Sequence, residues 1–237
     1  MRWQSVSATH VGLVRKVNED AILDRPDIGV WAVADGMGGH AAGDLASQML
    51  VESLGRLRVP ADLSTFVEFA EHNILAVNDR LLDLSRFRHQ VIGSTIVTLL
   101  MRERHCAFLW AGDSRLYRLR DGRLEQLTTD HSQVEQYVQQ GLLSREDAQF
   151  HPDNNLITRA VGATQALFLD CDVSALQPGD RYLLSSDGLD KHVINEEIAD
   201  GLRRFELPRC ARHLINLALE AGGTDNVSVC LIEILDD

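Results

Sequence analysis

Three short runs of strand character open the hydrophobic pattern of the chain. In the third run, Val30 to Ala34 are apolar without a break, which is typical of a strand covered on both faces. Two longer stretches follow in which apolar side chains recur on one stripe, and these predict amphipathic helices. The expected strands cover residues 4–9, 20–23 and 29–34, and the expected helices cover residues 41–57 and 63–85.

Strand patterns return in the second half of the chain, where Asp121-Gly122 predicts a tight hairpin. Residues 132–155 are polar and are broken by Gly141 and Pro152, so we expect a short helical excursion outside the sheet. Antiparallel strands packed beneath paired helices are the simplest layer arrangement for this order of elements. The expected strands cover residues 94–101, 106–111, 115–120, 124–127, 168–173, 181–186 and 227–235, and a further amphipathic helix covers residues 208–221.

The composition is that of an ordinary globular protein, with 45% apolar and 24% charged residues among 237. No repeat or low-complexity linker divides the chain, so we expect a single domain over residues 1–237. The formal net charge of −12 disfavours a nucleic-acid or anionic-membrane surface. No apolar run reaches the roughly 18 residues of a membrane span, and the N-terminus lacks the apolar segment of a signal peptide. We therefore expect a cytoplasmic protein.

The four cysteines are widely spaced and form no Cys-x-x-Cys pair, which argues against a zinc knuckle or a disulfide framework. Three of them lie in apolar or helical settings and are expected to be core thiols. The four are Cys106, Cys171, Cys210 and Cys230.

Two apolar runs end in the dipeptide Asp-Gly, at Asp35-Gly36 and Asp187-Gly188, and Asp225 begins a further apolar run. Carboxylates gathered at strand ends are the ligands that a hard divalent cation prefers. Turn formation alone also explains an Asp-Gly pair, as at Asp121-Gly122. Asp35-Gly36 differs because no strand follows it. The glycine there is expected to let the backbone approach a ligand, with its carbonyl as a second contact.

A dinucleotide-binding fingerprint is the competing interpretation of the same segment. Gly36, Gly38 and Ala41 have the required spacing, and Asp62 follows about 20 residues later. An acid directly before the first glycine would face a pyrophosphate with no metal to neutralise it, and the chain lacks an alternating strand-helix-strand order. The metal interpretation is therefore favoured.

Five motifs in a fixed order decide between these interpretations. They are RKVNED at residues 15–20, DGMGGH at 35–40, GDSR at 112–115, SDGL at 186–189 and GTDN at 223–226. Together they resemble the metal-dependent PP2C (PPM) protein phosphatases, particularly the compact bacterial members. The segments TDHS at 129–132 and TRAVG at 158–162 fit the same pattern, so the resemblance covers nearly the whole chain.

The resemblance implies an α+β fold, a four-layer α-β-β-α sandwich of two mainly antiparallel sheets, with residues 132–155 as a flap beside the cleft. It implies two Mn²⁺ or Mg²⁺ ions and a third, looser ion. The ligands would be Asp35, the Gly36 carbonyl, Asp187 and Asp225, with Glu19 and Asp20 acting through water and Asp113 joining Asp187 at the third ion. Arg15 would bind the substrate phosphate, and Asn226 would either orient Asp225 or only form a turn.

The expected activity is hydrolysis of phosphoserine and phosphothreonine by direct attack of a water that bridges the two ions, with no enzyme nucleophile. The expected substrates are phosphorylated proteins of a bacterial Ser/Thr kinase, in a type VI secretion setting or another one. We expect the enzyme to act as a monomer. A regulatory pseudophosphatase that binds phosphoproteins without turnover is the non-enzymatic alternative, and the intact Asp35, Asp187 and Asp225 argue against it.

The general acid and one departure from the family pattern stay open at this stage. Met37 follows the Asp-Gly pair where many relatives have histidine, so His40, His131 or a metal-bound water remains as the proton donor. Asp190 stands where the family commonly has threonine, and it alters metal affinity or has no effect.

Overall fold

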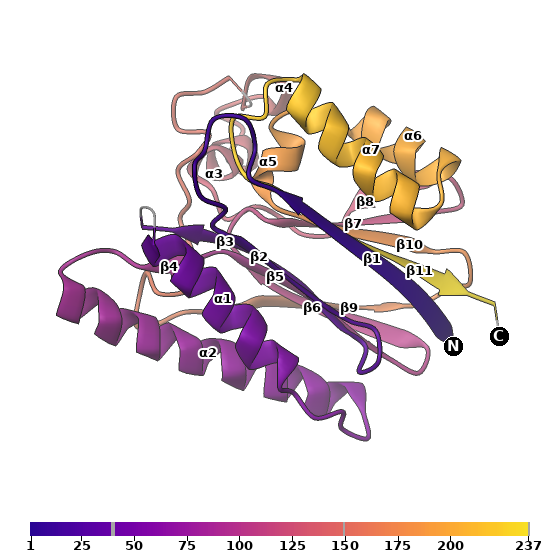
Figure 1. Cartoon of the computed structure of the whole chain (residues 1–237), viewed down its shortest axis with the longest axis horizontal. Coiled ribbons are helices and arrows are strands. Elements are labelled where there is room, and N and C mark those ends of the chain that lie inside the picture. Colours follow the sequence, from indigo (N-terminus) through magenta and orange to yellow (C-terminus); the bar gives the residue numbers. More distant parts are fainter. Residues whose placement is uncertain (39–40, 149, 237) are drawn as a thin grey trace.

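Two antiparallel β-sheets lie face to face at the centre of the computed structural model, which describes residues 1–38, 41–148 and 150–236 (Figure 1). The first sheet has the strand order β1 (Arg2–His10), β11 (Val227–Leu235), β10 (Arg181–Ser185), β7 (Arg115–Arg120) and β8 (Arg123–Gln126). The second has the order β2 (Asp20–Arg25), β3 (Val30–Met37), β5 (Ile96–Arg102), β6 (His105–Ala111) and β9 (Asp170–Ala175), and the short β4 (Gly93–Ser94) pairs with β3.

Helices cover both outer faces, which gives the expected α-β-β-α sandwich (Figure 1). The second sheet is covered by α1 (Ala41–Gly55) and α2 (Leu63–Arg88). The first sheet is covered by α5 (Asp187–Asp190), α6 (Asn195–Arg204) and α7 (Leu207–Glu220). The segment after β8 holds the short α3 (Gln133–Gln139) and α4 (Arg145–Ala148), so the helical excursion is confirmed.

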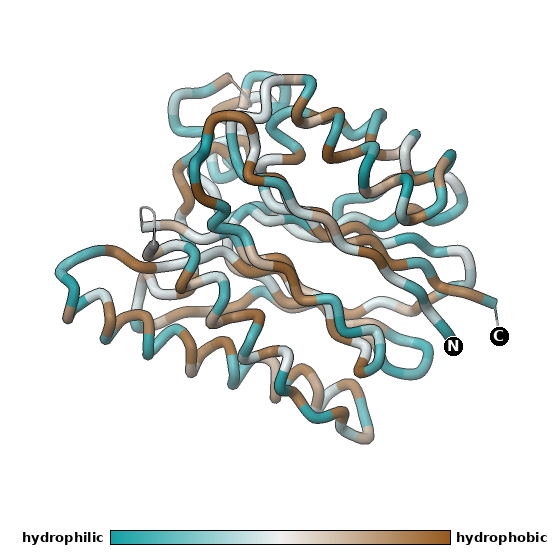
Figure 2. Tube along the Cα trace, viewed as in Figure 1, coloured by the Kyte–Doolittle hydropathy of each residue, from teal (hydrophilic) through white to brown (hydrophobic). Residues whose placement is uncertain are grey.

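Buried apolar side chains lie between the two sheets and between each sheet and its helices. Along the trace, hydrophobic and hydrophilic residues are interspersed in the strands and helices (Figure 2). Between the sheets, Trp31, Phe108 and Tyr182 are almost fully buried. Each sheet also packs against its own helices, through Phe66 and Leu81 on one side, for example. β3 is covered on both faces, by helices on one side and by the first sheet on the other, and this explains its near-continuous apolar run. No helix in the described residues is long and apolar enough to cross a membrane.

Strand pairing brings distant segments to one end of the sandwich. β1 and β11 pair along their whole length, with His10 opposite Val227, so the loop after β1 starts beside the segment that enters β11. β2 and β3 pair with Asp20 opposite Asp35. β10 lies beside β11 and runs directly into α5.

Most expected elements are present, and three differ. The strand expected at residues 94–101 is broken at Thr95 into β4 and β5. The strand expected at 168–173 is β9, two residues later, because its pairing with β6 begins at Asp170 and leaves Phe168 exposed. α6 was not predicted, although Ile198 and Leu202 form its buried stripe.

Several local predictions are confirmed. Asp121 and Gly122 join β7 to β8 with φ of 50° and 76°, as a tight hairpin requires. All four cysteines are free thiols, and Cys171 is the exposed one. Asp62 accepts the backbone N–H of Thr65 at 2.8 Å as the N-cap of α2. Since this acid caps a helix and the sheets are antiparallel, the dinucleotide interpretation is wrong.

Candidate functional site

Five aspartates from separate parts of the sequence meet at the end of the sandwich just described. Asp20 and Asp35 come from the paired strands β2 and β3, while Asp113 follows β6. Asp187 begins α5, and Asp225 lies two residues before β11. Burial raises the pKa of Asp35 well above its usual value, and the charges of the other four aspartates raise it further. The five carboxyl groups are therefore within electrostatic reach of one another.

The carboxylates on the paired strands, those of Asp20 and Asp35, lie among polar groups but away from water. Ser186 Oγ donates a hydrogen bond to Asp20 Oδ2 at 2.8 Å. Burial raises the pKa of Asp20 to about 7, although hydrogen bonds from Ser228 and Ser186 act in the opposite direction. Ionising these groups together is costly without a cation, and a divalent ion would remove that cost.

The break between β4 and β5 fixes the backbone of Asp35. Thr95 donates its N–H to the Asp35 carbonyl at 2.8 Å, and its Oγ1 accepts the N–H of Asp35 at 3.0 Å. Ser94 Oγ donates to the same carbonyl at 2.9 Å. The uninterrupted strand that the sequence predicted would not supply these side-chain bonds, so the break serves to hold Asp35 in place.

Gly36 is required by a backbone contact within the fold. A Cβ on Gly36 would collide with the carbonyl of Gly43 in α1 and with the carbonyl oxygen of Glu19. The Gly36 N–H donates to that Glu19 carbonyl at 3.1 Å. The glycine therefore allows β3 and α1 to touch backbone to backbone, and the Glu19 side chain lies against Gly43 at the same contact.

His131 holds the turn that carries Asp113. Its Nδ1 accepts the N–H of Gly112 at 3.1 Å, and its ring stacks on Trp110 with 6.0 Å between centroids. Its Nε2 lies 3.2 Å from an oxygen of Asp170, and burial lowers the pKa of His131. Both ring nitrogens therefore have structural partners, and His131 is not placed to act as the general acid.

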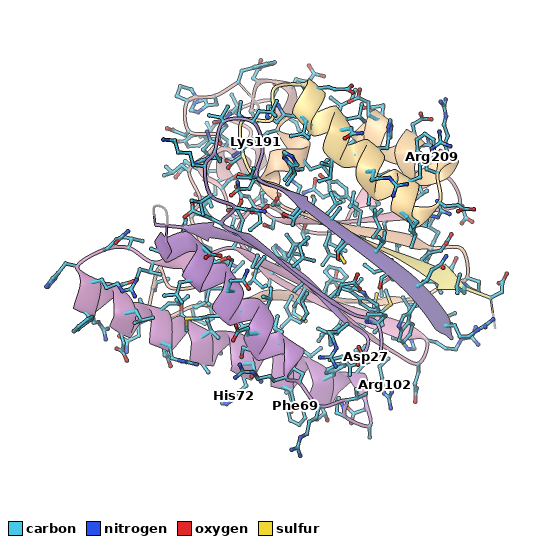
Figure 3. All side chains as sticks on the ribbon, viewed as in Figure 1. Asp27, Phe69, His72, Arg102, Lys191 and Arg209 are labelled. Atoms are coloured by element: carbon cyan, nitrogen blue, oxygen red, sulfur yellow. The ribbon has the colours of Figure 1, made fainter. Side chains whose placement is uncertain are left out.

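Two basic side chains reach the carboxylates of Asp187 and Asp225. Arg15 Nη2 lies 2.9 Å from Asp225 Oδ2, and this hydrogen bond raises the pKa of Arg15. Lys191 Nζ lies 2.5 Å from Asp187 Oδ2 and 3.7 Å from Asp225 Oδ2. Figure 3 shows Lys191 at the end of the sandwich opposite Asp27 and Arg102.

Asp190 forms an ion pair with a second arginine. Arg115 Nη1 lies 2.9 Å from Asp190 Oδ2, and the same guanidinium binds both carboxylate oxygens of Asp130. Burial raises the pKa of Asp190 to about 7 despite the opposing charge of Arg115. Arg115 thus connects β7 with α5, and the carboxylate that departs from the family pattern takes part in this connection.

Asn226 supports the loop that carries Arg15. Its Oδ1 accepts the N–H of Glu19 at 2.8 Å, and its Nδ2 donates to the carbonyls of Val11 at 2.9 Å and Val17 at 3.0 Å. The side chain is almost fully buried. The backbone N–H of Asn226 also donates to Asp225 Oδ1 at 2.9 Å, so the residue orients this carboxylate, as one of its two expected roles requires, while its side chain holds residues 11–19.

The donor set fits hard divalent cations. One oxygen each of Asp20, Asp113 and Asp187 is buried and accepts no hydrogen bond, which is the state that a metal ligand leaves behind. Among the described residues, no three acidic, histidine or cysteine side chains already close around one point. Ion binding therefore requires rotation of carboxylate side chains, and Arg15 shifts against Asp225.

The structure gathers Arg15, Glu19, Asp20, Asp35, Gly36, Asp113, Asp187, Asp225 and Asn226 at this end of the fold. His40 lies outside the described residues. Sequence reasoning missed Lys191, Arg115 and Thr95. The spacing of Lys191, four residues after Asp187, was an available signal, since it puts both side chains on one face of a helical turn.

A family profile described as "Protein phosphatase 2C" matches residues 13–220 of the chain. A "Putative protein phosphatase 2C-type" of Streptococcus pyogenes is 34% identical over 232 residues, covering 94% of both chains. The solved structure of PppA, described as a key regulatory component of T6SS in Pseudomonas aeruginosa, is 41% identical with a TM-score of 0.93 and 98% coverage of both chains.

A third similarity concerns the bound metal. The catalytic domain of the serine/threonine protein phosphatase PstP, solved in complex with two manganese ions, is 33% identical with a TM-score of 0.89. The superposition covers 99% of each chain.

Proposed function

Since the chain belongs to the protein phosphatase 2C family, it is a metal-dependent protein serine/threonine phosphatase with two Mn²⁺ or Mg²⁺ ions, and we propose which of its residues do the work. Asp35, Asp187 and Asp225 hold the ions, together with the Gly36 carbonyl. Glu19 and Asp20 contribute through water, and Asp113 faces Asp187 on the outer side. The observation that carries this assignment is the convergence of Asp20, Asp35, Asp113, Asp187 and Asp225 at one end of the sandwich, where one oxygen each of Asp20, Asp113 and Asp187 is buried without a hydrogen-bond partner.

Arg15 binds the substrate phosphate in this proposal. Its guanidinium is half exposed and already carries an anion, the carboxylate of Asp225, at 2.9 Å. When Asp225 turns to an ion, the guanidinium is free to take two oxygens of a phosphate instead. Asn226 keeps the Arg15 loop at the right distance through its three hydrogen bonds.

The divalent ions, when bound, activate a water for attack on phosphorus and screen the charge of the phosphate. The residues of the chain then orient the phosphate ester and keep other reactants away from it. Among the described residues of this cluster, Ser186 binds Asp20 and His131 binds Gly112 and Asp170, so neither is placed as a nucleophile. This supports direct attack by water without a covalent enzyme intermediate.

We propose phosphorylated proteins of a bacterial Ser/Thr kinase as the substrates, in a kinase-controlled type VI secretion setting. The similarity to PppA at 41% identity supports this setting. A cytoplasmic location is part of the same proposal, and the four free thiols fit a reducing compartment.

Phosphate release from a phosphothreonine peptide tests the assignment. With Mn²⁺ present, Asp35→Asn and Asp225→Asn should each lower kcat/KM by at least about 100-fold relative to the unchanged chain, because each removes a charged ligand. Asp27→Asn is the matched control, because Asp27 is exposed and pairs only with Arg25 at the far end of the sandwich. Equal rates in all four proteins would overturn the assignment, and binding without turnover in the unchanged chain would favour the pseudophosphatase.

A further inference from the structure

Lys191 is a basic residue of the carboxylate cluster to which the proposed function gives no task. Its ammonium lies 2.5 Å from Asp187 Oδ2 and 3.7 Å from Asp225 Oδ2, and its side chain is only 27% exposed. The backbone N–H of Lys191 caps α5 by donating to the Asp187 carbonyl, so the residue is fixed at both its backbone and its side chain.

Three carboxylates act on this ammonium. Burial lowers the pKa of Lys191, but the charges of Asp187, Asp225 and Asp113 together raise it well above its usual value. In return, Lys191 lowers the pKa of Asp113 against the effect of burial. The ammonium therefore lies in the field of the pair, Asp113 and Asp187, to which the sequence assigned a third ion.

The net charge of the site indicates what an ammonium at the position of Lys191 does. Six carboxylates, two divalent ions and Arg15 leave one net negative charge, which disfavours an anionic substrate. A single further positive charge cancels it. Asp190 and Asp130 share the guanidinium of Arg115, and these three groups are counted apart from the six carboxylates.

We propose that Lys191 is a built-in third cation, whose ammonium stays at Asp187 and takes the place of the looser third ion. The proposal rests on the proposed ligand roles of Asp187 and Asp225. The enzyme then binds two metal ions, and its third cation is a side chain whose charge does not depend on the metal concentration. Lys191 is then a positioning residue for Asp187 and for the field at the phosphate.

Counting bound ions tests the proposal. Equilibrium dialysis against Mn²⁺ should give two ions for the unchanged chain, and Lys191→Met, which keeps the length but removes the charge, should bind a third. Lys16→Met is the matched control, because Lys16 and Lys191 are the two lysines of the sequence and both residues are exposed, while Lys191 is the one that pairs with Asp187. It should bind two ions with unchanged affinity.

The possible outcomes separate this inference from the proposed function. Three ions in the unchanged chain, or an identical titration for Lys191→Met, would overturn the third-cation role while the two-ion enzyme stands. An unchanged chain that binds no Mn²⁺ would overturn the proposed site itself.

A second measurement needs no substitution, in case Lys191→Met fails to fold. Reductive methylation of the unchanged chain, read by mass spectrometry, should modify Lys16 rapidly and Lys191 at least about tenfold more slowly, both with and without Mn²⁺. Equal rates at the two lysines in the Mn²⁺-loaded protein would show that the ammonium is not held at Asp187, and would contradict the proposal.

Discussion

The amide of Asn226 joins the loop that carries Arg15, the proposed phosphate-binding residue, to the segment that enters β11. It uses both of its polar atoms on the backbone of residues 11–19. Asn226 is buried and the three bonds are partly buried, so its removal leaves backbone groups with only partial access to water in place of these bonds. The position of Arg15 therefore depends on a residue that need not touch either metal or substrate.

Asn226→Ala should lower stability and weaken phosphate binding. Loss of the buried amide costs about 1–3 kcal/mol, which corresponds to a melting temperature about 2–10 °C lower. With a phosphopeptide, KM should rise several-fold while kcat falls less, because Arg15 is displaced and the metal ligands stay. Steady-state kinetics and thermal melts check this.

The control for this prediction is Asn195→Ala, since Asn195 is exposed at the start of α6. Unchanged kinetics in Asn226→Ala would mean that the loop holds its shape without the amide.

At the scale of elements, the site depends on backbone contacts that only glycine permits. Gly36 lets β3 touch α1, and Gly188 lets α5 touch the segment that enters β11, where a Cβ would collide with the Asn226 carbonyl. Both glycines follow a proposed metal ligand directly. The Asp-Gly pairs at these positions are therefore packing devices that bring an acid and a neighbouring element together.

Gly188→Ala should destabilise the protein by about 1–3 kcal/mol, because two backbone segments must separate to admit the methyl group. The shift of Asp187 should also weaken Mn²⁺ binding, measured by calorimetric titration. Gly201→Ala is a matched change in α6, where the nearest atoms to the added Cβ are side-chain carbons at 3.4 Å. It should leave Mn²⁺ binding unchanged and raise stability by up to about 1 kcal/mol. Equal effects of the two substitutions would refute the packing argument.

At the scale of the whole molecule, metal binding affects the stability of the packing between the two sheets. Asp20 and Asp35 come from the second sheet, while Asp187 and Asp225 lie at the ends of first-sheet strands. Without ions their repulsion acts across the sandwich, and with ions the same groups join its two halves.

A chelator should therefore lower the melting temperature, by about 5–10 °C relative to protein saturated with Mn²⁺. The difference should widen from pH 6 to pH 8. The folded pKa values of Asp20, about 7, and Asp35 lie above those of the unfolded chain, so the metal-free fold loses stability as pH rises through this range. The metal-loaded fold keeps these groups ionised and escapes that loss. Calorimetry at both pH values checks this, and a melting curve unaffected by the chelator while activity disappears would contradict it.

Much of this protein is determined by its sequence alone. The periodicity of β3, the stripes of α1 and α2 and the Asp121-Gly122 hairpin follow from local preferences, and the five ordered motifs identify the family and its two ions. These features are predictable because each depends on residues near one another in the chain, or on a string of letters that can be matched directly.

Tertiary structure decided the rest, because the deciding contacts join segments far apart in sequence. The break at Thr95 exists because Asp35 of another strand bonds to it, and α6 is defined by burial against the first sheet. His131 accepts a hydrogen bond from Gly112 and is not placed as the acid. Asn226 donates hydrogen bonds to a loop some 200 residues away in the sequence. The sequence indicated no role for Lys191, because its ammonium meets the carboxylates of α5 and of the segment before β11 only in the folded chain, and charge acts through space.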